Sequence, residues 1–129
     1  MITIKKLSES LLNSWGKDTA QGGNWDESTP SLNQCAVTAL VVQDYLGGDL
    51  MRQKLNDGDS HYWNRLPDGQ EIDLSFEQFR RTKQYGVGDV VIREREYTLS
   101  FPDTVKRYEI LKDRVDRYLE ISENGIPVS

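Results

Sequence analysis

The segment from residue 35 to residue 46 is apolar on nearly every side, and it constrains the fold more than any other part of the chain. It reads Cys-Ala-Val-Thr-Ala-Leu-Val-Val-Gln-Asp-Tyr-Leu and is followed by Gly47 and Gly48. A helix with apolar side chains on all faces lies inside a protein, and two glycines are typical of a helix end. The pattern therefore predicts a buried helix over residues 35–46.

The elements on either side of this helix follow from simpler patterns. Residues 3–15 carry apolar side chains at spacings of three and four, which predicts an amphipathic helix that stops at Gly16. Residues 16–32 are rich in Gly, Asp, Ser and Thr and predict a long loop, of a length that is often functional. Residues 49–55 alternate in polarity and predict a strand.

Two strands, at 60–66 and 70–74, are predicted to form a hairpin. They are separated by Pro67-Asp68-Gly69. Proline presets the φ angle that a turn needs, and glycine accepts a positive φ. This tripeptide therefore predicts a tight turn between two antiparallel strands.

The rest of the chain predicts two helices and one strand. Ser75 opens a predicted short helix to about residue 81, residues 89–99 predict a strand, and a helix is predicted from residue 102 to about 122, before a frayed tail at 123–129. Helices followed by mostly antiparallel strands and a closing helix define an α+β fold. We expect one domain over residues 1–129, in which the buried helix packs on a small antiparallel sheet between N- and C-terminal helices.

Composition argues against several classes of protein. The net charge is −5, whereas nucleic acid and anionic membranes bind clustered Lys and Arg. The N-terminus lacks a secretory signal, and no apolar run reaches the roughly 18–20 residues of a membrane span. With one cysteine and one histidine, no internal disulfide can form and a structural zinc site would lack ligands. We expect a cytoplasmic protein with no cofactor, metal, nucleic-acid partner or membrane attachment; its oligomeric state stays open.

Cys35 is a candidate nucleophile because it opens the buried helix. Ser31 with Gln34 matches a capping box, and Asn33 is an alternative cap. A helix N-terminus favours a thiolate and can point backbone N–H groups at an oxyanion. The alternative is an inert cysteine that only fills the core.

His61 and Asp73 are candidate partners of this thiol. If the turn is a three-residue loop, Leu66 faces Gln70 and Asp73 shares a sheet face with His61, one diagonal step away at about 7–8 Å between backbones. The carboxylate can then reach the imidazole Nδ1 and orient it. A loop of two or four residues would place Asp73 on the opposite face, and His61 could also be purely structural.

Three stretches resemble known thiol enzymes: Gln34-Cys35-Ala36-Val37-Thr38-Ala39-Leu40, His61-Tyr62-Trp63-Asn64 and Glu71-Ile72-Asp73-Leu74. A Cys that opens a helix, a His-x-Trp-Asn strand, an Asp-Gly turn and a strand ending in Asp resemble the transglutaminase-like core, over roughly residues 33–79. Gln-Cys-Ala-Val-Thr-Ala-Leu with Ser-His-Tyr-Trp-Asn-Arg-Leu-Pro-Asp-Gly is similar to the YunG family of small uncharacterised bacterial proteins, over most of the chain.

The resemblance implies a papain/transglutaminase-like fold. It also implies a triad in which Cys35 is the nucleophile, His61 the base and Asp73 the residue that orients the base. The chain differs from larger members in its small size and its lack of a recognisable substrate-binding subdomain.

Gln34 and Trp25 are further candidates for the oxyanion site or the cleft. Each could donate a side-chain N–H to an oxyanion, and Trp25 is the one large apolar residue of the long loop. We predict that this loop forms one wall of the cleft above Cys35, with Trp25 packed as the residue that anchors the loop. The alternatives are a plain packing role for Trp25 and a capping role for Gln34.

These residues together predict a thiol-dependent hydrolase or acyltransferase that acts on the carbonyl of an amide or thioester through a Cys-His-Asp triad. The expected substrate is a peptide or a small amide or acyl compound. Two alternatives remain: an inactive papain-like scaffold that serves as a binding or regulatory module, and a thiol redox sensor, which would lack a resolving cysteine within the chain.

Overall fold

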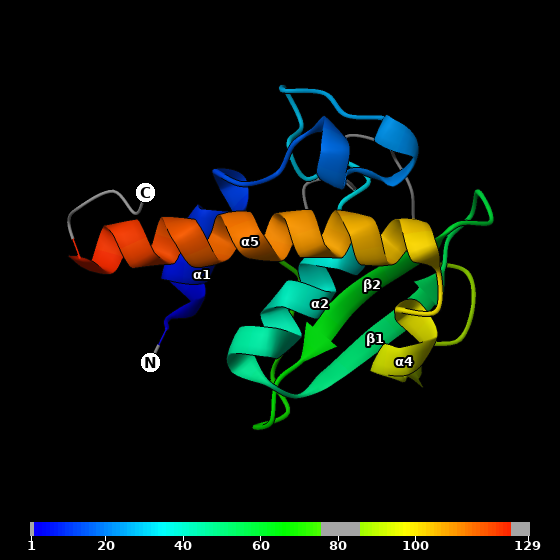
Figure 1. Ribbon diagram of the computed structural model, residues 1–129. Coiled ribbons are helices and arrows are strands. Elements are labelled where there is room, and N and C mark those ends of the chain that lie inside the picture. The colour runs from blue at the N-terminus through cyan, green and yellow to red at the C-terminus, as the bar shows by residue number, and fades with distance from the viewer. Residues whose placement is uncertain (1, 76–85, 125–129) are drawn as a thin grey trace.

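The computed structural model describes residues 2–75 and 86–124, whose arrangement is shown in Figure 1. The helices are α1 (Ile4–Leu12), α2 (Cys35–Leu46), α4 (Arg95–Thr98) and α5 (Pro102–Asn124), with two single-turn 3₁₀ helices, η1 (Lys17–Thr19) and η2 (Gln21–Gly23). The strands are β1 (Asp49–Lys54), β2 (Ser60–Arg65), β3 (Glu71–Ile72) and β4 (Val91–Arg93). Within these ranges, no helix has the length and apolar character needed to cross a membrane.

The apolar helix α2 is buried, as its sequence predicts. It packs against both β2 and α5, and Figure 1 shows it behind the long α5 helix and beside the two central strands. Val37, Val41 and Val42 of α2 are fully buried. They share a core cluster with residues of α1 and α5: Leu7, Leu11, Leu111, Val115 and Leu119. Each such side chain stabilises the fold by about 1.5–3 kcal/mol, so this core determines where α2 lies and where its first residue, Cys35, is presented.

The sheet is antiparallel, with the strand order β3-β2-β1-β4. The register of β1 and β2 pairs Asp49 with Arg65 and Gln53 with His61. Across the first of these pairs, the Arg65 guanidinium binds the Asp49 carboxylate at 2.8 Å. A small antiparallel sheet with flanking helices confirms the predicted α+β class.

The turn between β2 and β3 is the predicted three-residue loop. The N–H of Leu66 donates to the carbonyl of Gln70 at 2.7 Å, and Gly69 has a φ of 91°. The strands continue in register, with Asn64 opposite Ile72. Counting on by one residue along each strand brings Asp73, just after β3, opposite Trp63, so the predicted register is confirmed.

The predicted strand at 89–99 is only partly correct. Strand β4 covers three residues, and the chain then turns into the one-turn helix α4. The alternating pattern fails here because a long-range contact decides the backbone: the Arg95 guanidinium reaches back to α2 and donates to the Leu40 carbonyl at 3.3 Å. Tertiary contacts of this kind override a weak local preference.

The first helix is shorter than its apolar stripe. It ends at Leu12, and Trp15 lies beyond it, where the indole N–H donates to the Thr38 hydroxyl at 2.9 Å. The last helix runs to Asn124, close to its predicted end. The short helix predicted after Ser75 and most of the predicted tail at 123–129 lie outside the described residues.

Candidate functional site

Cys35 is the first residue of α2 and is 8% exposed. The first hydrogen bond within the helix runs from the N–H of Thr38 to the carbonyl of Gln34, at 2.9 Å. The backbone N–H groups before Thr38 therefore have no acceptor inside the helix, and the positive end of the helix dipole favours a thiolate at this position. The Cys35 Sγ lies 3.7 Å from the carbonyl oxygen of Ser60, at the start of β2.

The predicted capping box at the start of α2 is wrong. Gln34 is itself the N-cap and makes no capping bond with its side chain; its Nε2 donates instead to the carbonyl of Gly16 at 3.0 Å. The Ser31 hydroxyl is buried without a hydrogen-bond partner in the described structure. The chain enters the helix through Asn33 with a φ of 61°.

Gln34 is consequently turned inward, where it is fully buried. A buried amide needs a partner, and the Gly16 carbonyl supplies one. One N–H of the Gln34 amide is thus engaged by Gly16, and the Gln34 Oε1 has no hydrogen-bond partner among the described residues. The role of Gln34 as an oxyanion donor stays a prediction.

His61 and Asp73 form a close pair. The His61 Nε2 lies 2.5 Å from the Asp73 Oδ2, and the His61 side chain is 2% exposed. The ring nitrogen that meets the carboxylate is Nε2 and not the predicted Nδ1. The register of the strands brings the two side chains together, but the ring nitrogen that meets the carboxylate depends on how the imidazole packs, here stacked against Trp63.

Ser75 holds the Asp73 carboxylate in place, a role that sequence reasoning missed. The Asp73 Oδ1 accepts two hydrogen bonds at 3.0 Å, one from the Ser75 N–H and one from its hydroxyl. An Asp followed two residues later by Ser is a common local turn signal, and this signal could have revealed the interaction.

Trp63 covers the imidazole. Its ring stacks on His61 with a centroid separation of 5.8 Å and an angle of 19° between the planes. The indole N–H donates to the Glu71 carboxylate at 2.6 Å on the neighbouring strand. The stacked indole thus buries one face of the imidazole and adds a contact that restricts rotation of the ring.

The environment of His61 favours the imidazolium. Burial lowers its pKa, but hydrogen bonds with Asp73 and Cys35 and the charges of both groups raise it more, and the resulting pKa is about 9 against an ordinary value of 6.5. Cys35 is therefore among the groups that interact with this ring, and protonated His61 is the form expected at neutral pH.

The pKa of His61 predicts a pH dependence of stability. Because the pKa is higher in the folded state, its stabilisation is complete below pH 6.5 and is lost as the pH rises through about 9. We expect the free energy of unfolding to fall by up to about 3 kcal/mol across this range. Urea denaturation at several pH values measures it. His61→Gln should flatten the dependence, and an equal slope in this variant would contradict the prediction.

A cavity of about 400 Å³ opens beside Cys35. Its lining comes from several elements, with Gln21 from η2, Asp59 from the β1–β2 turn, Thr98 from α4 and Arg107 from α5. The Cys35 thiol is thus placed where a small molecule or a side chain could reach it, whereas neither His61 nor Asp73 is among the residues that line the cavity.

Trp25 does not line this cavity, contrary to the prediction. It is half-buried within its own loop, where its indole N–H donates to the Pro30 carbonyl at 3.1 Å. The loop reaches the cavity through Gln21 instead, whose N–H donates to the Asn33 carbonyl at 2.9 Å. Trp25 follows the two 3₁₀ helices η1 and η2, and the hydrogen bond of its indole is made within the loop itself.

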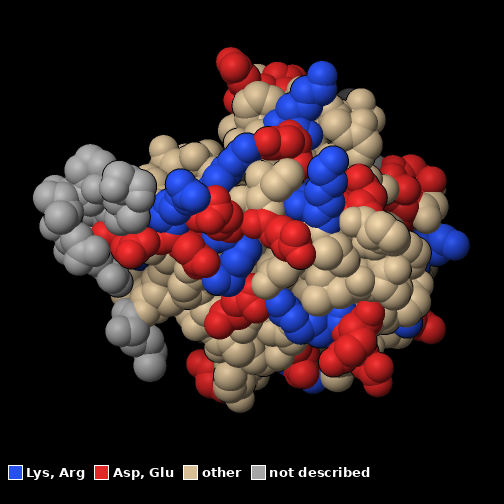
Figure 2. Space-filling view, in the orientation of Figure 1, with Lys and Arg blue, Asp and Glu red and all other residues tan. Residues whose placement is uncertain are grey.

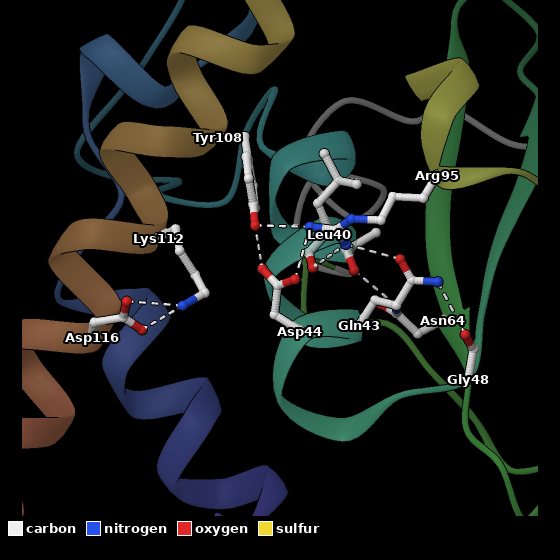
Figure 3. A network of polar contacts seen from close by, with 10 residues as sticks. Leu40, Gln43, Asp44, Gly48, Asn64, Arg95, Tyr108, Lys112 and Asp116 are labelled. Carbon is white, nitrogen blue, oxygen red and sulfur yellow. Dashed lines mark hydrogen bonds and ion pairs between the residues drawn. The ribbon is translucent and has the colours of Figure 1, made fainter. Parts of the chain in front are cut away.

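Arg95, the first residue of α4, joins this helix to α2 and α5 (Figure 3). Its guanidinium donates to Gln43 of α2 at 2.9 Å and to the hydroxyl of Tyr108 of α5 at 2.8 Å, and it pairs with Asp44 at 2.7 Å. Burial and then the Asp44 carboxylate raise the pKa of Tyr108 to about 12, so the phenol keeps its proton and donates to Asp44. This network joins α4, which carries Thr98, to two larger helices.

The fold and these contacts define an α+β protein with a thiol at a helix N-terminus and a buried His–Asp pair on the adjoining strands. The chain belongs to the YunG family, whose model, described as YunG protein, matches residues 3–120. It is 33% identical over 115 residues to the uncharacterized protein YunG of Bacillus subtilis (strain 168), covering 88% of this chain and 92% of that relative. No solved structure matches the chain.

Proposed function

We propose that the protein is a thiol-dependent hydrolase or acyltransferase of the papain/transglutaminase-like class, acting on an amide or thioester carbonyl. The observation that carries the proposal is the hydrogen-bonded His61–Asp73 pair, whose imidazole also interacts with Cys35 at the N-terminus of α2. A nucleophile, a base and a group that orients the base are the parts of a thiol triad. The substrate would be a peptide or a small amide or acyl compound.

The first half-reaction forms an acyl-enzyme. The Cys35 thiolate attacks the carbonyl carbon, a C–S bond forms, and the carbonyl π electrons move to oxygen. Backbone N–H groups at the start of α2 are suited to stabilise this oxyanion. As it collapses, the C–N or C–S bond of the substrate breaks, and the leaving amine or thiol takes a proton from His61.

The second half-reaction regenerates the thiol. His61, now neutral, removes a proton from water or from an acceptor amine, which attacks the thioester carbonyl. The acyl product leaves and the Cys35 thiolate and His61 imidazolium are restored. The Asp73 carboxylate accepts a hydrogen bond from the His61 Nε2–H throughout the reaction. Nδ1 is therefore the nitrogen that exchanges protons with the reacting groups. A lone thiol kept reduced also fits a cytoplasmic location.

The thiolate–imidazolium pair can be tested by alkylation. Cys35 is the only cysteine, so the rate of labelling with iodoacetamide reports on this thiol alone. We expect His61→Gln to lower the rate at pH 6 by about tenfold or more and to have little effect near pH 10, because the imidazolium stabilises the thiolate only while it is protonated. Identical pH profiles of the labelling rate for the wild-type protein and His61→Gln would refute the thiolate–imidazolium pair.

Acyl transfer itself needs a separate readout. With p-nitrophenyl acetate, the protein should release a burst of close to one equivalent of p-nitrophenolate as Cys35 becomes acylated, followed by slower turnover. Cys35→Ala should give no burst. A protein that alkylates normally but shows no burst would be a binding module on this scaffold. The feature that favours this second function is that His61 is buried and is not among the residues that line the cavity.

A further inference from the structure

The cavity beside Cys35 has three charged groups in its lining, and two of them neutralise each other. The Arg107 guanidinium, which is 9% exposed, donates to the Asp103 carboxylate at 2.8 Å. It also donates to the Thr104 hydroxyl and the Thr19 carbonyl, each at 3.4 Å. These contacts occupy the guanidinium within the protein, so it adds little net charge to the cavity.

The third charged group, Asp59, is not neutralised in this way. It lies in the turn between β1 and β2, and its backbone is held by hydrogen bonds to Leu55 and Asp57. Its exposed carboxylate has no hydrogen bond or ion pair with another described residue. Figure 2 shows acidic side chains gathered over the tip of this turn, whereas Lys and Arg alternate with Asp and Glu along α5.

Asp59 immediately precedes a residue that contacts the nucleophile. The next residue, Ser60, contributes the carbonyl that lies 3.7 Å from the Cys35 Sγ. A substrate that places its reacting carbonyl at Cys35 would therefore pass the neighbouring Asp59 carboxylate at the edge of the cavity. The two sides of the cavity thus differ in charge: a neutral Arg107–Asp103 pair on α5 and one negative group on the turn.

We propose that Asp59 selects substrates that carry a cationic group, an ammonium or a guanidinium, next to the carbonyl that reacts. The inference rests on the proposed function, because it assigns the substrate class of the same site. Opposite charges attract across the edge of a cavity, and because Asp59 is exposed, solvent screens its charge and limits the expected effect to a severalfold change in rate.

Charged methanethiosulfonates test the inference without a known substrate. The Cys35 thiolate attacks the sulfur of the reagent, a mixed disulfide forms, and methanesulfinate leaves. The rate with the cationic trimethylammonium-ethyl reagent is divided by the rate with the anionic sulfonato-ethyl reagent, and the quotient is normalised to that of a small free thiol. The ratio cancels the intrinsic reactivity of Cys35, and its change when Asp59 is substituted reports on the charge of that residue.

We expect the wild-type protein to favour the cationic reagent, and Asp59→Asn to lower the ratio by about fivefold to tenfold. Asp68→Asn removes the same charge from the exposed β2–β3 turn, outside the cavity lining, and should change the ratio by less than twofold. An equal change in both variants, or a wild-type preference for the anionic reagent, would overturn the inference.

The charge-ratio experiment and the p-nitrophenyl acetate burst test the selectivity and the proposed function separately. A normal p-nitrophenyl acetate burst together with an Asp59-independent charge ratio would reject the selectivity alone. A charge ratio that depends on Asp59, in a protein that shows no burst, would reject the chemistry and leave a cavity that binds cations.

Discussion

Asp73→Ala is expected to lower the rate constant of the p-nitrophenolate burst on the order of 100-fold. The substitution removes the acceptor of the His61 Nε2 proton and leaves that nitrogen buried without a partner. It also removes the carboxylate that stabilises the imidazolium. Asp73→Asn should lose only about tenfold, because the carboxamide oxygen can still accept the N–H although its charge is gone.

The matched control is Asp68→Ala, which removes an exposed carboxylate from the same hairpin. It should leave the burst rate within about twofold. Near-ultraviolet circular dichroism verifies that each variant is folded. The triad role of Asp73 would be rejected if Asp73→Ala and Asp68→Ala had equal burst rates, or if the Asn variant were slower than the Ala variant.

Gly48→Ala is expected to destabilise the protein by at least about 3 kcal/mol. Gly48 has a φ of +83°, and a Cβ there would overlap the carbonyl oxygen of Arg65 and lie 3.0 Å from the Cα of Leu66. The left-handed backbone costs about 1–3 kcal/mol for a residue with a side chain. The overlap adds a further penalty because both neighbours are backbone atoms, which cannot turn away as a side chain can.

Gly58→Ala separates the cost of the left-handed backbone from the cost of the overlap. Gly58 has a similar φ of +92°, but a Cβ there would meet no atom within 4 Å. It should therefore cost only about 1–2 kcal/mol. Urea denaturation gives both values, and equal losses at the two positions would show that the close approach at Gly48 is not a constraint.

The parts of the site that the sequence predicts are those set by local chemistry. The Pro67-Asp68-Gly69 tripeptide determines the loop length, and the loop length determines which sheet face Asp73 shares with His61. The apolar stretch after Gln34 predicts the burial of α2 in the same direct way. Both inferences need only a few neighbouring residues.

The parts that the sequence could not predict depend on contacts between distant residues. Gln34 meets the carbonyl of Gly16, and Arg95 meets residues of α2 and α5, so neither side chain's partner can be read from its own neighbourhood. The local sequence also does not show that the Nε2 of His61, and not Nδ1, meets Asp73, because the orientation of the ring depends on its stacking with Trp63.

The pairing of β1 with β2 means that an inserted residue has different effects in α2 and in the turn between the two strands. A residue inserted into α2 would rotate Cys35 by about 100° and shift it by about 1.5 Å along the axis, which would part it from His61. A residue inserted into the turn at 55–59 would leave His61 paired with Gln53, because the ladder ends before the turn begins. The turn can therefore change in length and charge without moving the His61–Asp73 pair, so that the edge of the cavity is structurally independent of that pair.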